Sequence, residues 1–499
     1  MTRRPNSTSP AATPDSRLNA ILVAAALGAG LLLRLWFIAR LSQVAGDSLV
    51  YGDIAKNFLQ HHIYGVTQQG LTPGSIIIHS TLIRLPGYPL FLAVCFRLFG
   101  MENYRAVLYV QLAADLVTCW LAAALAGRLF GRRAAYAALW LGALCPFLAN
   151  YVATPLTETL VLTSIALAFY AFDRWQHDAA HYNRWLWLIA IALSCSILLR
   201  PEQGLLAAAV VPAMLWAALA TPGRLAKPIL SIAPVLVASL CVLLPLVPWT
   251  ARNWHTFHVF QPLAPRSATD TGGYPLTGFN RWYRTWAIEF SSTEDVYWNY
   301  DGGHIELADV PTRAFASGCL AHHATPRESQ PLYAPTAALF ATYNQNTAAT
   351  PSVDARFNEL ASERIQANPI CYYVLLPVAR LLNMAFRPRT EFFDIESEWW
   401  RDRRHPGQIL FSAANAALNL AYFVLAAIGL RRWRTLNTTR TSWIGLPPLA
   451  WAMVAFIALR SALLLTLDNS EPRYTLEFFP VLIVFSAAIF APREQKANQ

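Results

Sequence analysis

The sequence is poor in charge. Only 14% of its 499 residues are Asp, Glu, Lys or Arg, against the roughly 25% that is typical of soluble proteins. It also lacks an HExxH pair of metal-binding histidines, a GxSxG nucleophile motif, a glycine-rich phosphate loop and any CxxC pair among its 7 cysteines. Each of these motifs has a defined chemistry. Their absence argues against a serine hydrolase and against chemistry driven by a bound nucleotide.

Long apolar runs are what the sequence has instead. Hydrophobic residues make up 55% of the chain, and the mean hydropathy is +0.33. Runs of about 20 apolar residues are long enough to cross a hydrocarbon core of roughly 30 Å as helices. The sequence therefore predicts an all-α polytopic membrane protein. We expect spans at 19–41, 105–127, 134–152, 157–173, 184–199, 203–220, 228–249, 408–430, 443–467 and 476–491.

Arginine-rich connectors orient these spans. The net charge of +10 comes largely from short connectors such as 127–133, 221–227 and 431–440, which is typical of cytoplasmic loops. No basic tract with interleaved aromatics lies in a soluble segment, so we expect no nucleic-acid partner. Two further apolar stretches, 89–100 and 370–386, would invert the orientation if they spanned. We therefore predict that both are interfacial helices on the outer face.

The loops divide the chain into five segments. The outer connector is rich in Pro, Gly, Trp and Tyr, and we expect it to cap the membrane part. Cys319 and Cys371 lie in it and could form a disulfide outside the cytoplasm, although we expect two free thiols. The predicted segments are a disordered cytoplasmic tail (1–18), a transmembrane core with the candidate site (19–249, first outer loop 42–104), a cap with an interfacial helix (250–407), C-terminal transmembrane helices (408–491) and a cytoplasmic tail (492–499).

The unusual polar residues collect on the outer side in this topology. Each lies at or near a helix end, where membrane depth makes a charge costly unless it is paired or used. Carboxylates and arginines at one interface are the groups needed to bind a phosphate-bearing lipid beside a base. These residues are Asp47, Asp53, Arg84, Glu158, Arg200, Glu202 and Arg473.

Several motifs occur in an order that resembles a known family. An acidic residue four positions before a tyrosine is followed by "IAKNF" and "RLPGYPLFLA", and later by "LLRPEQGLL", "PWTARNWHTF" and "EPRYTLEFFPVL". This order resembles the GT-C glycosyltransferases, in the branch with protein O-mannosyltransferases and the lipid A aminoarabinose transferase. The resemblance covers most of residues 20–490 and is weakest in 266–407. It implies a bundle of about 10–12 transmembrane helices with outer-face amphipathic helices and a small extracytoplasmic cap.

The resemblance also implies an activity. Such an enzyme transfers a hexose or pentose, with inversion, from a polyprenyl-phosphate donor to a protein, lipid or glycan acceptor. We expect it in the bacterial inner membrane, in contact with membrane lipids, with its site facing the periplasm. The alternative is a flippase for lipid-linked sugars without chemistry of its own. Transporters place charges near the bilayer midplane in discontinuous helices, whereas here we expect them at outer helix ends.

The resemblance assigns roles to two acidic residues. Asp47 matches the first-loop acid and is the candidate general base; the alternative is an N-cap for a helix beginning near Ser48. Glu158 matches the second-loop acid and would place the acceptor or a divalent cation, or simply begin a helix. Better-known members have two adjacent acids in the first loop, whereas Ser48 follows Asp47 here. Whether a metal is required is therefore left open.

Three arginines are the candidate ligands of the donor phosphate. Arg84 stands where the family has a basic residue, and Arg200 and Arg473 would join it, because a planar guanidinium binds phosphate oxygens bidentately. The alternative for all three is snorkelling to lipid headgroups. Asp53 lies about 600° around a helix from the candidate base and should face solvent or pair with Lys56. Further residues that could line the site are Tyr51, Asp53, Tyr88, Glu202 and Tyr474.

Overall fold

The computed structural model describes the chain between residues 14 and 492, with gaps. Most of the two predicted tails and Cys319 lie outside the described residues. The described residues are 14–69, 75–178, 182–220, 228–265, 274–300, 302–317, 326–346, 350–393, 395, 399–400, 404–436 and 446–492.

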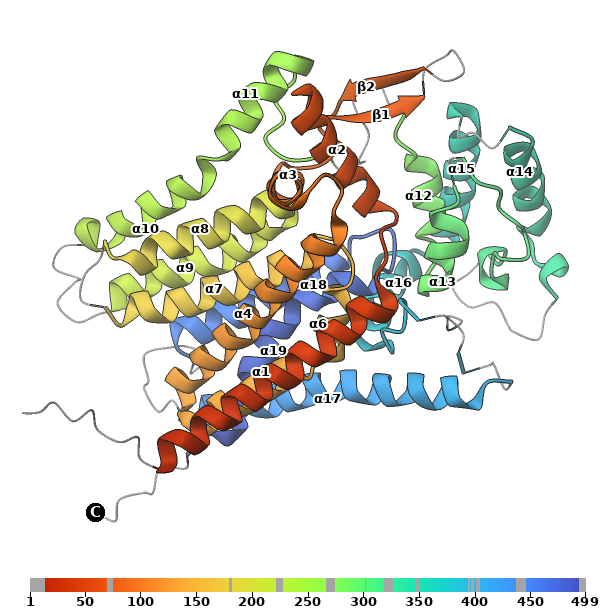
Figure 1. The fold of residues 1–499 in the computed structure, drawn as a ribbon. Coiled ribbons are helices and arrows are strands. Elements are labelled where there is room, and N and C mark those ends of the chain that lie inside the picture. Colours follow the sequence, from red (N-terminus) through yellow and green to blue (C-terminus); the bar gives the residue numbers. More distant parts are fainter. Residues whose placement is uncertain are drawn as a thin grey trace, which may run out of the picture.

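The first half of the chain is a series of helices with one β-hairpin (Figure 1). Its elements are α1 (Pro14–Leu41), α2 (Asp47–His61), β1 (Gly65–Gln69), β2 (Ile76–Ser80), α3 (Gly87–Phe99), α4 (Tyr104–Phe130), α5 (Arg132–Ala143), α6 (Pro146–Tyr151), α7 (Glu158–Gln176), α8 (Arg184–Leu199), η1 (Pro201–Gln203), α9 (Gly204–Ala220), α10 (Pro228–Leu243) and α11 (Leu246–Phe257).

The second half begins with the shorter helices of the cap and then returns to the bundle (Figure 1). Its elements are α12 (Thr277–Tyr283), α13 (Phe290–Ser292), the π-helix η3 (Thr293–Tyr297), η4 (Thr312–Ala314), η5 (Arg327–Ser329), α14 (Tyr333–Asn346), α15 (Pro351–Ala367), the π-helix η6 (Cys371–Leu375), α16 (Leu376–Phe386), α17 (Pro406–Leu436), α18 (Pro448–Leu464), η7 (Pro472–Phe478), α19 (Phe479–Ala487) and η8 (Ala488–Phe490).

Six stretches among the described residues are helical, long and apolar enough to cross a membrane. A seventh results if the pair Pro351–Ala367 and Cys371–Phe386, bent by 102°, is one span. The prediction of an all-α polytopic membrane protein is thus confirmed. The six stretches are Asn19–Leu41, Tyr104–Phe130, Pro201–Ala220, Ser231–Phe257, Pro406–Leu436 and Pro472–Phe490.

Four of the ten expected spans are not among these six stretches. The predicted spans outside the six are 134–152, 157–173, 184–199 and 443–467. The first is broken between α5 and α6, and the second forms α7, which carries charged residues at its ends. The last two form α8 and α18, which have only 16 and 17 residues. Hydropathy alone reveals neither the break nor the shorter helices.

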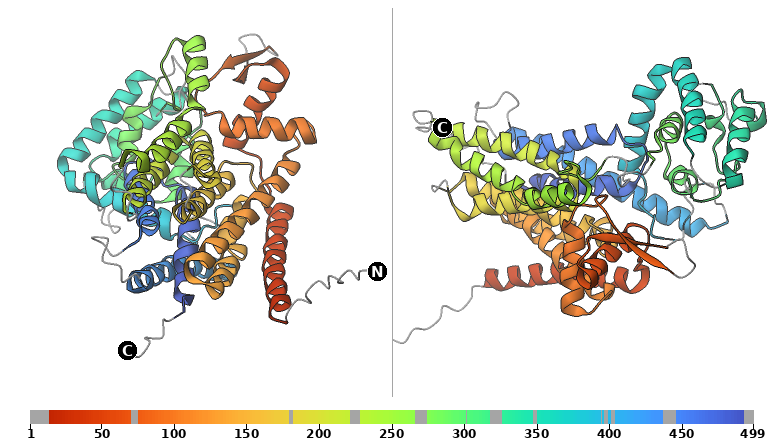
Figure 2. Two further views of the ribbon diagram at one scale, coloured as in Figure 1. Left: turned by 90° about the vertical axis from the view of Figure 1, so that its left-hand side faces the viewer. Right: turned by 90° about the horizontal axis from the view of Figure 1, so that it is seen from above.

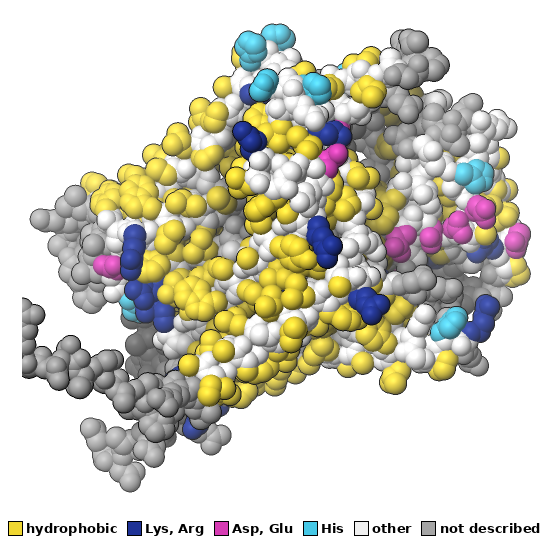
Figure 3. Space-filling view, in the orientation of Figure 1, with side chains coloured by type: hydrophobic (Ala, Val, Ile, Leu, Met, Phe, Trp, Pro, Cys, Tyr) yellow, Lys and Arg dark blue, Asp and Glu magenta, His cyan; other side chains and the backbone are white. Residues whose placement is uncertain are grey.

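The side of the bundle and the cap differ in the side chains that they expose (Figure 3). Helix α4 packs against α5, α7 and α1, while α17 packs against α19 and α18 against α9. The start of α1 lies at one end, and α2, the hairpin and the cap lie at the other (Figures 1 and 2). Hydrophobic side chains cover the visible side of the bundle, whereas acidic side chains gather over the cap (Figure 3). This distribution fits a bundle whose sides face lipid.

One element departs from the all-α prediction. Strands β1 and β2 pair antiparallel within the first outer loop, with Gly65 opposite Ser80 and Gln69 opposite Ile76. Asp53 on α2 accepts hydrogen bonds from the backbone N–H and the hydroxyl of Thr67, at 2.6 and 2.8 Å. Helix α2 therefore holds the hairpin. Strands of 5 residues are too short to give a clear alternating pattern.

A glycine allows α3 to approach α8 closely. A Cβ atom on Gly87 would lie 2.6 Å from the carbonyl carbon and oxygen of Leu198. Any side chain at this position would have to displace backbone. Arg84 precedes this contact by three residues and Arg200 follows it by two. The contact therefore brings the two arginines to the same end of the bundle.

The cap has a hydrophobic core of its own, built mainly from aromatic rings. The rings of Phe279 and Tyr300 stack with centroids 3.6 Å apart, and helices α12 and α15 pack together. Asp354 on α15 accepts hydrogen bonds from the backbone N–H groups of Gly278 and Phe279, each at 2.8 Å. Cys371, at the start of η6, is disulfide-bonded, so the expectation of a free thiol is wrong for this residue.

A fully buried ion pair ties α1 to α4. Arg34 Nε donates to Asp115 Oδ2 at 2.5 Å. The other guanidinium nitrogens donate to the carbonyls of Gly30, Gly142 and Ala143 at 2.9, 3.2 and 2.6 Å. An unpaired charge in an apolar bundle is costly. The pair and these carbonyls therefore fix α1 against α4 and the end of α5.

Replacing Arg34 by Met should destabilise the protein strongly, because the buried carboxylate of Asp115 loses its counter-charge. We expect a loss of about 3–5 kcal/mol, measured as a large fall in the apparent melting temperature of the detergent-solubilised protein. The double variant Arg34→Met, Asp115→Leu removes both charges and should recover most of the loss. A double variant that melts as low as the single one would contradict this explanation.

Candidate active site

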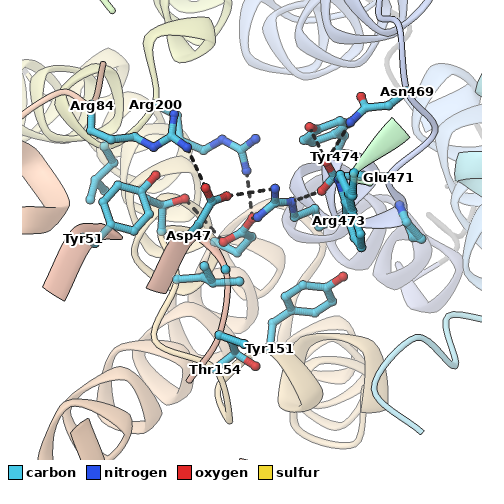
Figure 4. A pocket seen from close by; sticks show the side chains of 18 of the residues that line it. Asp47, Tyr51, Arg84, Tyr151, Thr154, Arg200, Asn469, Glu471, Arg473 and Tyr474 are labelled. Carbon is cyan, nitrogen blue, oxygen red and sulfur yellow. Dashed lines mark hydrogen bonds and ion pairs between the residues drawn. The ribbon is translucent and has the colours of Figure 1, made fainter. Parts of the chain in front are cut away.

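A pocket of about 1030 Å³ lies at the end of the bundle that carries α2 and the cap. Its wall comes from the start of α2, the loop before α3, the loop before α7, the α8–η1 turn, the cap and the segment 469–474. Carboxylate and guanidinium groups point toward one another in it (Figure 4). The predicted residues that line it are Asp47, Tyr51, Arg84, Glu158, Arg200, Glu202, Arg473 and Tyr474.

Asp47 lies between two guanidinium groups. Its Oδ1 accepts a hydrogen bond from Arg84 Nη2 at 2.6 Å, and its Oδ2 accepts one from Arg473 Nη2 at 3.0 Å. Helix α2 begins at Asp47, but its N-cap position is Gly46, whose φ of 54° is in the left-handed region. The Asp47 side chain therefore contacts the two arginines and does not cap the helix.

The two arginines also set the charge of Asp47. Burial alone raises the pKa of this carboxyl, but the positive charges of Arg473 and Arg84 outweigh it and hold the pKa below its usual value. Asp47 is therefore ionised at neutral pH. Burial raises the pKa of the neighbouring Tyr51 to about 12, so its phenol stays protonated.

Glu158 connects two of the predicted arginines. It is the first residue of α7 and is buried, and its Oε1 accepts a hydrogen bond from Arg200 Nη1 at 3.0 Å. Arg473 Nη1 lies 3.7 Å from the same oxygen. Arg473 also pairs with Glu471, so it faces three carboxylates. Together, Glu158 and Arg473 join α7 to the C-terminal helices.

Arg84 combines an ion pair with a buried donor that has no partner among the described residues. It forms an ion pair with Asp47, and its guanidinium lies 5.8 Å from the centre of the Tyr51 ring. Its Nε is buried and has no hydrogen-bond partner among the described residues. A buried donor without a partner is costly. Arg84 is therefore well suited to bind an additional anionic oxygen.

A second ionic network lies behind the pocket. Arg200 Nε donates to Glu202 Oε1 at 2.7 Å and lies 3.9 Å from Glu477 Oε1. Arg460 donates to Glu477 Oε1 at 2.8 Å, and both side chains are 1% exposed. The sequence analysis did not single out Arg460 or Glu477. The available signal was the lone arginine within an apolar run, because such a charge is usually paired or functional.

Two residues expected to line the site do not do so. Tyr88 is fully buried on α3, donates a hydrogen bond to Gln111 Oε1 at 2.6 Å, and packs behind Tyr51 with ring centroids 5.1 Å apart. Asp53 faces the hairpin instead of the pocket, as its Thr67 contacts require. The expected pairing of Asp53 with Lys56 is present, at 3.9 Å.

Several lining residues were not predicted. Glu391, after α16, accepts a hydrogen bond from the Tyr151 hydroxyl at 2.8 Å. Asn469 donates to Glu471 at 2.8 Å. The cap supplies Phe290, Glu294, Tyr297 and Trp298. Residues 250–407 have no motif or period that would have indicated these positions.

The pocket carboxylates do not form an evident metal site. Among the residues that the structure describes, no group of three His, Cys, Asp or Glu side chains is arranged to hold a metal ion. Asp47, Glu158 and Glu471 are each paired with an arginine. These residues do not fit a divalent cation, because guanidinium groups already occupy the positions that it would take.

Residues 84–249 match the family described as dolichyl-phosphate-mannose-protein mannosyltransferase. The match covers about a third of the chain. The matched segment includes Arg84, Glu158 and Arg200 and leaves Asp47 and Arg473 outside. No curated protein matches the sequence.

Several solved structures resemble the chain at low identity. The oligosaccharyltransferase AglB from Archaeoglobus fulgidus, in complex with an inhibitory peptide and a dolichol-phosphate, is 11% identical, with a TM-score of 0.46 over 95% of this chain and 50% of that chain. ArnT from Cupriavidus metallidurans in the apo state is 15% identical, with a TM-score of 0.35 over 96% of this chain and 77% of that chain. ArnT bound to undecaprenyl phosphate is 14% identical, with a TM-score of 0.35 over 95% of this chain and 78% of that chain. This chain thus spans about half the length of AglB.

Replacing Arg84 by Met should destabilise the protein in a pH-dependent way. A carboxyl whose pKa is lowered by folding stabilises the protein above its unfolded pKa, and this contribution is lost as pH falls through the folded pKa. We therefore expect the melting temperature of the native protein to exceed that of Arg84→Met by a constant amount above about pH 5, and the difference to shrink below about pH 4.

The matched control is Arg105→Met, which removes an exposed arginine that donates to Tyr109. We expect no pH-dependent difference for this variant. The measurement is the apparent melting temperature of the three detergent-solubilised proteins from neutral pH to about pH 3.5. A difference between native protein and Arg84→Met that grows toward acid pH would contradict the assigned pairing.

Proposed function

We propose that this protein is a glycosyltransferase that moves a sugar from a polyprenyl-phosphate donor to an acceptor hydroxyl. The observation that carries the proposal is the Asp47 carboxylate between Arg84 and Arg473, inside a large pocket at one end of a membrane bundle. The transfer needs a carboxylate that accepts a proton and cations that bind the phosphate. Here the Asp47 carboxylate accepts a hydrogen bond from each of the two guanidinium groups.

The arginines bind the donor phosphate in this proposal. Arg84 contributes the buried Nε that has no partner among the described residues, and Arg473 and Arg200 lie on other parts of the pocket wall. Their planar guanidinium groups can each make two parallel hydrogen bonds to phosphate oxygens. Negative charge grows on the phosphate as it leaves, so these contacts strengthen toward the transition state.

The reaction is a direct displacement at the anomeric carbon. The acceptor oxygen forms a bond to that carbon while the bond from the carbon to the phosphate oxygen breaks. The electron pair of the broken bond stays on the polyprenyl phosphate, and the acceptor proton moves to Asp47. Configuration at the anomeric carbon is inverted because attack and departure occur on opposite faces.

Donor binding would make Asp47 a better base. Its pKa is held low while Arg84 and Arg473 face it, and a base of low pKa accepts a proton poorly. The donor phosphate would draw these guanidinium groups toward itself and weaken their effect on Asp47. The pKa of Asp47 would then rise, because burial raises it and less positive charge lowers it. Proton transfer is thereby favoured only when the donor is present.

Glu158 has a positioning role in this scheme. It lies in the pocket wall, is buried, and forms ion pairs with Arg200 and Arg473. Its negative charge offsets the repulsion between the two guanidinium groups and orients them. No step is routed through a divalent cation, because the carboxylates present are already paired with arginines.

The location of the site belongs to the same proposal. The protein would be in the inner membrane of a bacterium, with the arginine-rich connectors in the cytoplasm and the pocket in the periplasm. The disulfide at Cys371 is consistent with an oxidising compartment on the cap side. A polyprenyl-phosphate donor fits this location, because its sugar is carried by a lipid and needs no nucleotide site.

A flippase remains the rival function. It would also need arginines for lipid phosphates but would not need a carboxylate between them. In an established transporter arrangement, the charges lie near the middle of the bilayer. The pocket instead lies at the cap end of the bundle, which favours the transferase.

The deciding experiment compares native protein with Asp47→Asn in proteoliposomes that contain a labelled polyprenyl-phosphate sugar. We expect kcat to fall about 10²–10⁴-fold, because the acceptor loses its base. The matched control is Asp53→Asn, the same change six residues later on α2 and outside the pocket. It should keep transfer within about threefold.

Two results would count against the proposal. Equal transfer by native protein and Asp47→Asn would eliminate Asp47 as the base. Movement of intact labelled donor across the membrane, with no cleavage of its sugar–phosphate bond, would support the flippase instead.

A further inference from the structure

The cap contributes one wall of the pocket that the proposed mechanism does not use. Four residues of α13, η3 and the position after it line this wall: Phe290, Glu294, Tyr297 and Trp298. Their spacing of i, i+4, i+7 and i+8 puts them on one face of a helical segment. Residues on the opposite face, such as Val296, are buried in the cap core. This face is therefore directed at the pocket by the fold of the cap.

Trp298 offers an open aromatic surface on this wall. Its side chain is 52% exposed although it lines the pocket. Its ring meets that of Phe290 at 87°, with centroids 5.4 Å apart. The guanidinium of Arg387 lies 4.6 Å from the Phe290 ring. Phe290 is thus held in place and supports Trp298, which leaves indole surface available to a ligand.

Planar polar groups lie on the same side of the pocket. Glu294 is on the aromatic face, and Asn469 and Glu471 come from the neighbouring segment before η7. The Asn469 amide donates to Glu471 at 2.8 Å, which fixes its orientation. Carboxylates accept hydrogen bonds and amides both donate and accept them. They are therefore suited to the hydroxyl groups around the edge of a sugar ring.

The cap wall contacts the segment that carries Arg473, which pairs with the candidate base Asp47. Arg284 pairs with Asp468 at 3.4 Å, and the Ser470 N–H donates to Thr293 Oγ1 at 3.4 Å. These contacts join the cap to the segment that carries Arg473. The segment Thr293–Tyr297 is also a π-helix, a form found frequently at functional sites.

The pocket is large enough for two substrates. Its volume of about 1030 Å³ is at the upper end of the range for a pocket that holds one drug-sized ligand, roughly 300–1,000 Å³. The donor headgroup would take the arginine side. Space beside the cap wall is then left for an acceptor.

We infer that this cap wall is a subsite for a sugar ring of the acceptor, so that the acceptor is a saccharide and not a peptide. The inference rests on the proposed function. The apolar C–H face of the ring would lie on Trp298, and its hydroxyl groups would meet Glu294 and Asn469. The acceptor hydroxyl next to the bound ring would then reach toward Asp47.

The test variant is Trp298→Ala, and the matched control is Trp400→Ala. Trp400 is 50% exposed and lies outside the pocket. Both variants should melt like the native protein, because each lost side chain is half exposed. The full chain is placed in lipid nanodiscs, so that no sugar-based detergent competes for the subsite.

The first readout is binding, which does not depend on catalysis. Saturation-transfer NMR measures contact of the protein with maltotriose, with chitotriose and with a Ser/Thr-containing hexapeptide. We expect the NMR saturation to pass from the protein to at least one of the saccharides and not to the peptide. We expect Trp298→Ala to weaken saccharide binding at least about tenfold, Trp298→Tyr to restore much of it, and Trp400→Ala to leave it unchanged.

The second readout is transfer from the labelled donor. For Trp298→Ala we expect the KM for the saccharide acceptor to rise about tenfold or more, while the KM for the donor stays within about twofold. Saccharide binding without transfer by the native protein would leave the subsite standing and overturn the proposed function. Three results would overturn the subsite: no contact with either saccharide, an increase in the KM for the donor instead, or Trp298-dependent binding of the peptide.

Discussion

The ion pairs around Asp47 are the interaction on which the site depends. Asp47 begins α2, and Arg473 follows it by 426 positions. Arg84 reaches the same carboxylate from the loop before α3. Buried or half-buried charges of this kind are stable only when each finds its partner, so the pocket forms only when the first and last thirds of the bundle are packed together. The geometry of the site is thus a property of the whole fold.

The apolar runs and the arginine-rich connectors were sufficient to predict the class of fold and the end of the bundle at which the polar residues gather. They were not sufficient to predict which of the apolar runs form broken or short helices. Mean hydropathy does not register the break at 144–145 or the polar ends of α7. The hairpin was also missed, because its pairing depends on α2, where Asp53 binds Thr67.

The site was predictable where a residue belongs to a motif and lies at or near a helix end. Asp47, Arg84 and Arg473 are of this kind, and they meet in the pocket. Tyr88 belongs to the same motif as Arg84 but falls on the inner face of α3, where it is fully buried. No sequence pattern indicated the residues of the cap wall. Their position in the pocket is set by long-range contacts such as that of Arg284 with Asp468.

The buried contact of Arg34 with Asp115 has a consequence for biogenesis. The two residues are 81 positions apart, and the chain is made from its N-terminus. The first helix therefore enters the bilayer with a guanidinium whose counter-charge has not yet been synthesised. Such a helix is poorly suited to stay alone among lipids. It must be retained near the insertion machinery, or near water, until α4 has followed it, so that early steps of assembly have an imposed order.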